Sequence, residues 1–265
     1  MDEKMIACYS MEEQKLISGL DELFVEWERL FEKWDNPNEM FVRDGFIPGY
    51  LKSKKKILFI GRDSYDVWDG CWIGNVFDLY STGWSWGKWI DQIAFHKRMI
   101  KVAYSLGYCG AVYPEWECIP RARYLSQKGI LMKEYGFAFM NLGKIGHGSE
   151  SAVGTNADWK LIHKSVDIST GGSRNYIAEE INLLDPDIII SMNLSANKLV
   201  FELAFDGRLC EIDKNVDCNV YGYKINGEKR IPLLDVWHFS GSSGGQKGYY
   251  YYDVILKGLN KYNNG

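Results

Sequence analysis

The stretch KILFIGRDSY, residues 56–65, decides the fold class of this chain. Its centre, Ile57 to Ile60, is a continuous apolar run of the kind that forms a strand buried on both faces in a parallel sheet. Gly61 ends the run, and Asp63 and Tyr65 follow at once. In an open, mostly parallel sheet, ligands bind outside the carboxyl ends of the strands. We therefore expect Asp63 at the functional edge of such a sheet.

Three further apolar runs end in a polar side chain in the same manner. They are residues 137–140 before Asn141, residues 188–192 before Asn193, and residues 231–237 before His238. The carboxyl ends of parallel strands meet at one edge of a sheet. We therefore expect one site that contains Asp63, Asn141 and His238.

The remaining periodicities predict helices and one hairpin around this sheet. Apolar residues at three- and four-residue steps predict an amphipathic N-terminal helical extension over about residues 11–36, which Asn36-Pro37 ends. Asn226-Gly227 between two strand-like runs is a strong signal for an antiparallel hairpin in the C-terminal third. Further helices are predicted at residues 89–106, 174–184, 196–205 and 249–259, and long loops at residues 62–87 and 143–155.

Length and composition favour one α/β domain over residues 1–265. The chain is 46% hydrophobic and 15% aromatic, which supplies a large buried core, and it contains no internal repeat or linker. Its apolar runs are shorter than the roughly 20 residues needed to span a bilayer. The polar start lacks the apolar segment of a secretion signal. We expect a cytoplasmic protein without a membrane partner.

The cysteines and histidines predict neither a metal site nor a cofactor. None of the six cysteines forms a C-x-x-C pair, so buried thiols are the simplest interpretation, although the even count leaves a disulfide open. His147 lies in a glycine-rich segment, and His163, together with Asp158, is the other candidate for a metal ligand. Neither histidine has the helical spacing of paired metal ligands or a nearby cysteine.

The charge balance argues against a protein that coats nucleic acid non-specifically. The formal net charge is −4, and the sequence pI is about 5.7. A local basic patch stays open, because phosphate contacts depend on a few Lys and Arg residues on one face. The candidate patches, which solvated surface would also explain, are residues 52–56, 97–101 and 121–123.

Four short segments resemble motifs of one known family. Residues 61–66, GRDSYD, resemble the G-Q-D-P-Y-H motif of the uracil-DNA glycosylase superfamily. Residues 74–78, GNVFD, are similar to its glycine-led segment with a base-stacking phenylalanine. Residues 139–142, FMNL, are similar to its strand-end asparagine segment, and residues 237–241, WHFSG, to its H-P-S loop. The segments come in the family's order, and the resemblance covers roughly residues 57–259.

The resemblance implies both a fold and an activity. The fold would be a three-layer α/β/α sandwich around a central four-stranded, mostly parallel sheet. The activity would be hydrolysis of the N-glycosidic bond of a base in DNA, where the base is flipped out of the duplex or taken from a single strand. DNA would be the partner, and no cofactor or metal would be required.

Within that expectation each candidate residue has a chemical task. Asp63 would orient a water molecule and stabilise positive charge on the sugar, and His238 would donate a hydrogen bond to the departing base as a neutral imidazole. Asn141 offers a donor and an acceptor to a pyrimidine edge, Phe77 would stack on its face, and Tyr65 would wall the pocket. Helix capping or core packing would also account for these residues. Candidate phosphate or loop contacts are Arg62, Ser64, Lys144, Ser240 and Ser242.

Departures from the family pattern keep two alternatives open. Ser64 and Phe239 replace prolines that would fix two loops, and residues 238–246 lack a bulky apolar wedge. The fold could therefore serve as a catalytically silent module that binds a nucleotide, a nucleic acid or a protein. The chain could also be an unrelated α/β hydrolase that acts on small nucleosides or glycosides.

Overall fold

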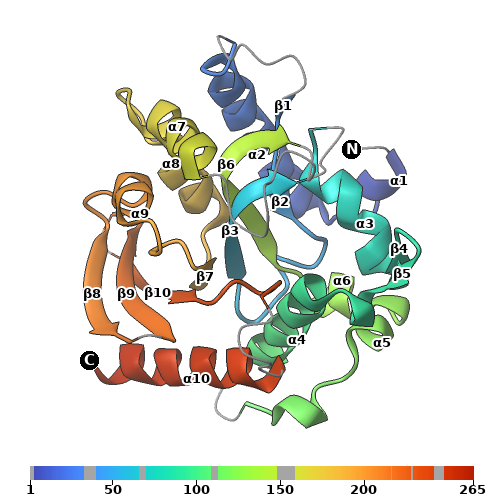
Figure 1. Cartoon of the computed structure of the whole chain (residues 1–265). Helices are drawn as coiled ribbons and strands as arrows, with labels where there is room; N and C mark the ends of the chain where they lie inside the picture. The colour runs from blue at the N-terminus through green and yellow to red at the C-terminus, as the bar shows by residue number, and fades with distance from the viewer. Residues whose placement is uncertain are drawn as a thin grey trace.

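The computed structural model has helices packed on a large mixed sheet (Figure 1). It describes residues 3–32, 40–65, 70–108, 113–147, 159–215, 217–227, 229–241 and 248–265. The sheet has eight strands in the order β1-β6-β3-β7-β10-β9-β8, with β2 paired to β6. The α/β class and the C-terminal antiparallel hairpin are thus confirmed.

Four central strands of the sheet run parallel to one another. They are β6 (Ala138–His147), β3 (Ile57–Tyr65), β7 (Ile188–Met192) and β10 (Lys229–Val236), in that spatial order. After β3 the chain adds β6 on one side and then crosses to add β7 and β10 on the other. The direction of winding therefore reverses beside β3, which is the position where open α/β sheets form their ligand crevice.

Antiparallel strands extend this parallel core at both edges, so the sheet has eight strands rather than the four expected. The additional strands are β1 (Met40–Phe41), β2 (Gly45–Phe46), β8 (Leu209–Lys214) and β9 (Cys218–Ile225). The predicted turn joins β9 to β10, and Asn226 and Gly227 both adopt positive φ, 47° and 96°. This is the conformation that favours Asn-Gly in a tight hairpin. A separate small hairpin consists of β4 (Trp84–Ser85) and β5 (Lys88–Trp89).

Helices cover both faces of the sheet (Figure 1). Side chains on β9 demonstrate this, because Tyr221 packs on Phe201 of one helix, whereas Cys218 lies against Gly258 of another. One face carries α2 (Met11–Arg29), α7 (Trp159–Thr170), α8 (Tyr176–Leu184) and α9 (Lys198–Ala204). The other face carries α3 (Trp72–Thr82), α4 (Ala94–Tyr108) and α10 (Gly248–Asn264). The short helices are α1 (Glu3–Ile6), α5 (Ala122–Gln127) and α6 (Leu131–Glu134). None of the described helices is long and apolar enough to cross a membrane.

Several predicted boundaries were wrong. The N-terminal helix α2 ends at Arg29 rather than near residue 36, and α4 begins at Ala94 rather than Trp89, which belongs to β5. The expected loop 62–87 contains α3 and β4, the first strand of the small hairpin. Strands β3 and β6 run on to Tyr65 and His147, so the start of the expected loop 143–155 is strand, and its remainder lies outside the described residues.

Candidate functional site

Strand β3 carries the first part of the site on its extended carboxyl half. A register shift between Asp63 and Ser64 interrupts its pairing with β6. Irregularities of this kind re-aim side chains at the end of a strand and are frequent beside active sites. The side chains of Arg62 and Asp63 are half-buried there, whereas Ser64 is buried.

Asn141 and Ser64 hold the ends of β3 and β6 together. The Asn141 side chain donates a hydrogen bond from Nδ2 to Ser64 Oγ at 3.0 Å. A Cβ atom on Gly61 would lie only 2.3 Å from Asn141 Oδ1, so glycine is required for this close approach. Asn141 is 4% exposed, and Ser64 is 1% exposed. Ser64 thus contacts Asn141 inside the protein, and its expected phosphate or loop contact and the base-edge role of Asn141 both stay predictions.

His238 follows β10, and the loop that begins at this residue holds its ring in place. The backbone N–H of Ser240 donates to His238 Nδ1 at 3.3 Å, and the Ser240 hydroxyl lies 2.6 Å from the same nitrogen. Because Nδ1 accepts from a backbone N–H, we assign the proton of the neutral ring to Nε2. The ring of Phe95, on α4, stacks on the imidazole with a centroid distance of 5.5 Å.

Burial keeps His238 neutral, and the charges of Arg62 and Asp63 act on its imidazole. Burial, and next the positive charge of Arg62, lower the pKa of His238 from 6.5 to about 4, while Asp63 opposes this shift. The imidazole is therefore uncharged at neutral pH and presents an N–H donor. Arg62 and Asp63 at the end of β3 thus act on the charge of His238, which follows the parallel strand β10 at the same edge of the sheet, although β7 separates the two strands.

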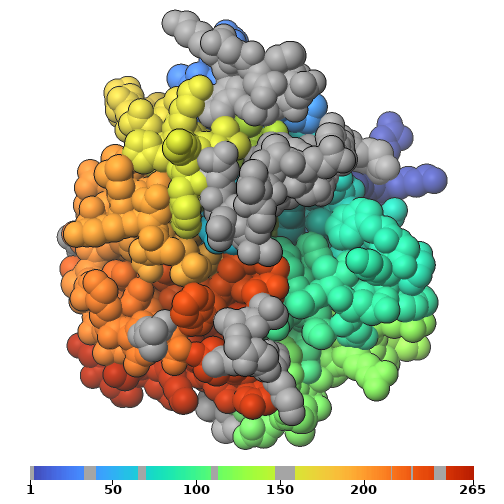
Figure 2. All heavy atoms as spheres, viewed as in Figure 1, coloured from blue at the N-terminus to red at the C-terminus, as the bar shows by residue number. Residues whose placement is uncertain are grey.

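Buried contacts anchor the loop after His238, where the family pattern would place a proline. Phe239 is fully buried and packs on Phe59 of β3 and Tyr251 of α10. Arg98 of α4 donates to the carbonyl oxygens of Phe239 and Gly241, and its guanidinium lies 4.0 Å from the centre of the Tyr251 ring. Arg98 was expected in a surface basic patch, but it is buried and supports the site instead. In Figure 2 the red-orange residues that end β10 reach the surface beside the teal residues of α3 and α4.

Lys144 has no access to a phosphate group, and that expectation was wrong. Its side chain is fully buried, with Nζ 2.5 Å from Asp44 Oδ2 and 2.7 Å from Glu180 Oε2. The ammonium also lies 4.6 Å from the centre of the Trp27 ring. Burial alone would lower the pKa of Lys144, but Asp44 and Glu180 outweigh burial and raise it. Lys144 is therefore the charged centre of a core ion cluster on the face of the sheet covered by α2 and α8.

Of the two aromatic candidates, the structure describes the side chain of Phe77. Phe77 lies on helix α3 rather than in a loop, half-buried and packed against the core, so its stacking role stays a prediction. The side chain of Tyr65 and the whole of Ser242 lie outside the described residues. Ser240 is exposed and contacts the His238 ring. Phe95 could not be singled out from the sequence, because it is one apolar position among many in an amphipathic helix.

The described residues contain no group of three or more His, Cys, Asp and Glu side chains that could hold a metal ion. Among the described cysteines, Cys8, Cys118, Cys210 and Cys218 are free thiols. The expectation of buried thiols holds for Cys218 but was wrong for Cys8, Cys118 and Cys210, which are exposed. Cys109, Asp158 and the side chain of His147 lie outside the described residues, and His163 is half-buried on α7.

The site combines three kinds of chemical group: a carboxylate, a neutral imidazole N–H donor and a guanidinium. They lie at the edge of the parallel sheet where the direction of winding reverses. Such a group can stabilise a cation on one part of a substrate and an anion on another. No protein-family model matches the chain, and no curated protein sequence is significantly similar to it.

Proposed function

We propose that the protein is a uracil-DNA glycosylase-like hydrolase that cleaves the N-glycosidic bond of a flipped or single-stranded base in DNA. The observation that carries the proposal is the neutral His238, with its proton assigned to Nε2, in the electrostatic field of Asp63. The four motif resemblances along residues 57–259 supply the choice of substrate. The reversal of strand winding beside β3 adds support, because crevices in such sheets form there.

The two side chains divide the charge that develops as the bond breaks. The departing base takes the bonding electrons, and negative charge collects on its carbonyl oxygen, where His238 Nε2–H would donate a hydrogen bond. Positive charge develops on the sugar, where the Asp63 carboxylate would stabilise it and orient the attacking water molecule. A neutral donor suits this task, because the proton stays on the imidazole while the base leaves as an anion.

Release of free base from labelled oligonucleotides tests the proposal. Single-stranded and duplex substrates that contain uracil or a damaged base should release it. Asp63→Asn and His238→Gln should each slow single-turnover release by about 10²–10⁴-fold, the usual contribution of such groups. Asp206→Asn, at an exposed position, and His163→Gln, on α7, are the matched controls. Failure of the wild type to release any base, beside an active reference enzyme, would count against catalysis.

A second candidate is a binding module that has the fold but not the chemistry. The observation that favours it is the Asn141 amide nitrogen, which is already hydrogen-bonded to Ser64 inside the protein. Such a module would bind an oligonucleotide without cleaving it. Binding through several phosphates should weaken steeply as salt concentration rises, whereas binding of a single nucleotide should respond little. Binding with no base release in both forms of substrate would select this candidate.

A further inference from the structure

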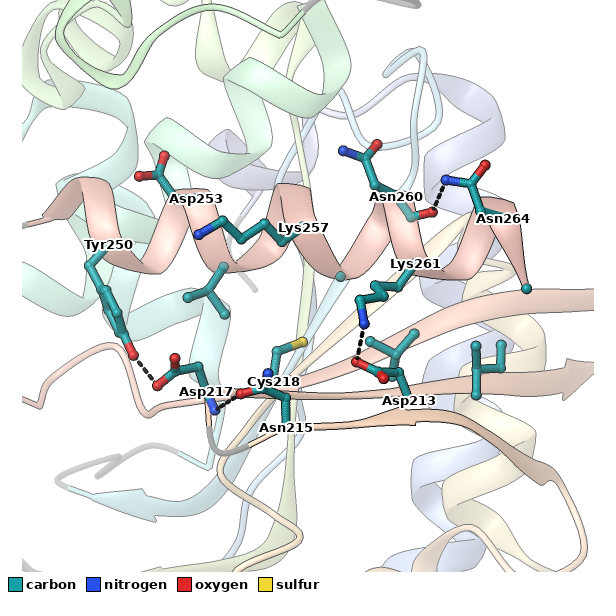
Figure 3. A pocket seen from close by; sticks show the side chains of 15 residues that line it. Asp213, Asn215, Asp217, Cys218, Tyr250, Asp253, Lys257, Asn260, Lys261 and Asn264 are labelled. Atoms are coloured by element: carbon teal, nitrogen blue, oxygen red, sulfur yellow. Dashed lines mark hydrogen bonds and ion pairs between the residues drawn. The ribbon is translucent and has the colours of Figure 1, made fainter.

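Surface and core ion pairs of this protein differ in how firmly they can hold a neighbouring residue in place. In the groove between helix α10 and strands β8 and β9, Lys261 Nζ lies 3.1 Å from Asp213 Oδ2 (Figure 3). Lys261 is exposed and Asp213 is half-buried, so water can replace either partner. Such pairs contribute little to stability. An ion pair that fixes the position of its neighbours needs a buried place in the fold.

The core ion cluster of Asp44, Lys144 and Glu180 is buried in this way. All three side chains are shielded from water, and they combine two carboxyl groups with one ammonium group. Asp44 Oδ1 and Glu180 Oε1 are also buried, and they accept no hydrogen bond from the residues that the structure describes. With both carboxyl groups ionised, the cluster would carry one uncompensated negative charge, which is costly in the interior. The cluster therefore favours a proton on one of its carboxyl groups.

Asp44 connects the core ion cluster to the candidate site. Its Oδ2 accepts from Lys144 Nζ at 2.5 Å and from the backbone N–H of Asn141 at 2.8 Å. The Asn141 side chain in turn donates to Ser64 Oγ of strand β3 at 3.0 Å. Asp44, Asn141 and Ser64 are all buried. A continuous series of contacts between buried groups thus runs from Glu180 on α8 to the end of β3.

The two donors to Asp44 Oδ2 compete for the same negative charge. When Glu180 is ionised, it shares the ammonium of Lys144, and Asp44 Oδ2 stays a strong acceptor for the Asn141 N–H. When Glu180 is protonated, Lys144 pairs chiefly with Asp44 and reduces the negative charge on that oxygen. Hydrogen bonds to a charged acceptor are shorter and stronger than those to a neutral one, and burial increases the difference. The proton on Glu180 should therefore weaken the hydrogen bond that holds Asn141.

The environment of Glu180 brings this proton into the neutral range. Burial raises the pKa of Glu180 from 4.5 to about 7; Lys144 opposes this shift, and Asp44 adds to it. These two residues are the charged groups that act on Glu180. Helix α2 presents the rings of Phe24 and Trp27 to the Lys144 ammonium, and these rings carry no titrating group.

We propose that the core ion cluster positions Asn141 in the candidate site, and that proton binding by Glu180 weakens this hold and slows base release. The inference rests on the proposed function, in which Asn141 meets the edge of the base. Asp44 and Glu180 are positioning residues, because they act on the backbone of Asn141 and do not touch the substrate.

An NMR titration of Asn141 between pH 5 and 9 tests the positioning without any substrate. The backbone N–H of Asn141 should move downfield as pH rises, with a midpoint near 7, because its hydrogen bond to Asp44 strengthens. Glu180→Gln should remove this change, since it retains an oxygen for Lys144 but cannot ionise. Glu179→Gln, at the next position of α8 with its carboxylate on Arg174, is the matched control and should retain it. A wild-type Asn141 resonance that does not move over this range would overturn the proposal, as would a change that persists in Glu180→Gln.

Single-turnover base release then tests the effect on the reaction. At pH 8 Glu180→Gln should release base about three- to tenfold more slowly than the wild type, the effect of weakening one hydrogen bond, and at pH 5 the two rates should agree. Equal rates at pH 8, in a wild type that releases base, would overturn the proposed effect on the reaction. If the wild type releases no base, the proposed function fails, whereas the Asn141 titration still decides whether the cluster positions this residue. The wild-type titration decides this alone if Glu180→Gln fails to fold.

Discussion

Replacing Lys144 by methionine should destabilise the protein more at pH 8 than at pH 5. Lys144 lies between the buried carboxyl groups of Asp44 and Glu180, with its Nζ 2.5 Å from Asp44 Oδ2 and 2.7 Å from Glu180 Oε2. Methionine retains most of the side-chain length but removes the charge. Removing one partner of a buried ion pair costs about 3–5 kcal/mol when the other stays ionised. We expect a loss of that size at pH 8.

The pH dependence follows from Glu180. Burial, together with the charge of Asp44, raises the pKa of Glu180 from 4.5 to about 7, against the opposing effect of Lys144. A carboxyl group with a higher pKa in the folded state binds more protons there. Its contribution to stability is complete below pH 4.5 and is lost as pH rises through about 7. The wild type should therefore lose about 3 kcal/mol from this group between pH 4.5 and 8.

Without Lys144 the two carboxyl groups become protonated more readily. At pH 5 the cost of the substitution should fall to that of lost hydrogen bonds, about 1–3 kcal/mol. Glu180→Gln removes the titrating group and retains an oxygen that accepts from Lys144, so it should flatten the fall in stability between pH 5 and 8. Urea unfolding at several pH values measures both effects, with the fluorescence of the fully buried Trp27 as one reporter beside Lys144.

Lys224→Met is the control, because Lys224 is an exposed lysine on strand β9. It should change the free energy of unfolding by no more than about 0.5 kcal/mol at any pH. The reasoning is refuted if Lys144→Met is as stable as this control at pH 8. It is also refuted if Glu180→Gln retains the full pH dependence of the wild type.

Two further predictions concern the candidate site. Base release should show no inflection from His238 between pH 5 and 8, because burial and Arg62 lower its pKa to about 4; an inflection near 6.5 that disappears in His238→Gln would contradict this. Gly61→Ala should cost about 1–3 kcal/mol in thermal unfolding, because its Cβ atom would lie 2.3 Å from Asn141 Oδ1 and 2.9 Å from Phe139 Cζ. Gly172→Ala, where a Cβ atom meets nothing within 4 Å, is the matched control, and equal stability of the two variants would disprove the steric argument.

The sequence predicted best where one strong local rule applies. The apolar run 188–192 coincides with β7, because a strand buried on both faces tolerates little else. Asn226-Gly227 predicted the hairpin, because few other dipeptides adopt two positive φ angles with little conformational strain. Both signals lie within a few residues of the chain and need no knowledge of tertiary contacts.

The sequence predicted poorly those features that depend on contacts between residues far apart in the chain. Lys144 looks like a surface residue until Asp44 and Glu180 are placed beside it, and neither is close in sequence. Helix α7 was missed, because serine and threonine are weak helix formers; here the hydroxyls of Ser169 and Thr170 donate to carbonyl oxygens one turn earlier. The loop anchors Arg98 and Phe239 are likewise visible only in three dimensions.

The central claim is that the ends of β3 and β10 bring Arg62, Asp63 and His238 into one electrostatic unit. An NMR pH titration of the His238 imidazole nitrogens tests it most directly, in the wild type, Asp63→Asn and Arg62→Gln. The wild-type ring should be the neutral Nε2–H form with a pKa of about 4. That pKa should fall further in Asp63→Asn and rise in Arg62→Gln. A wild-type pKa near 6.5 that neither substitution moves would contradict the claim.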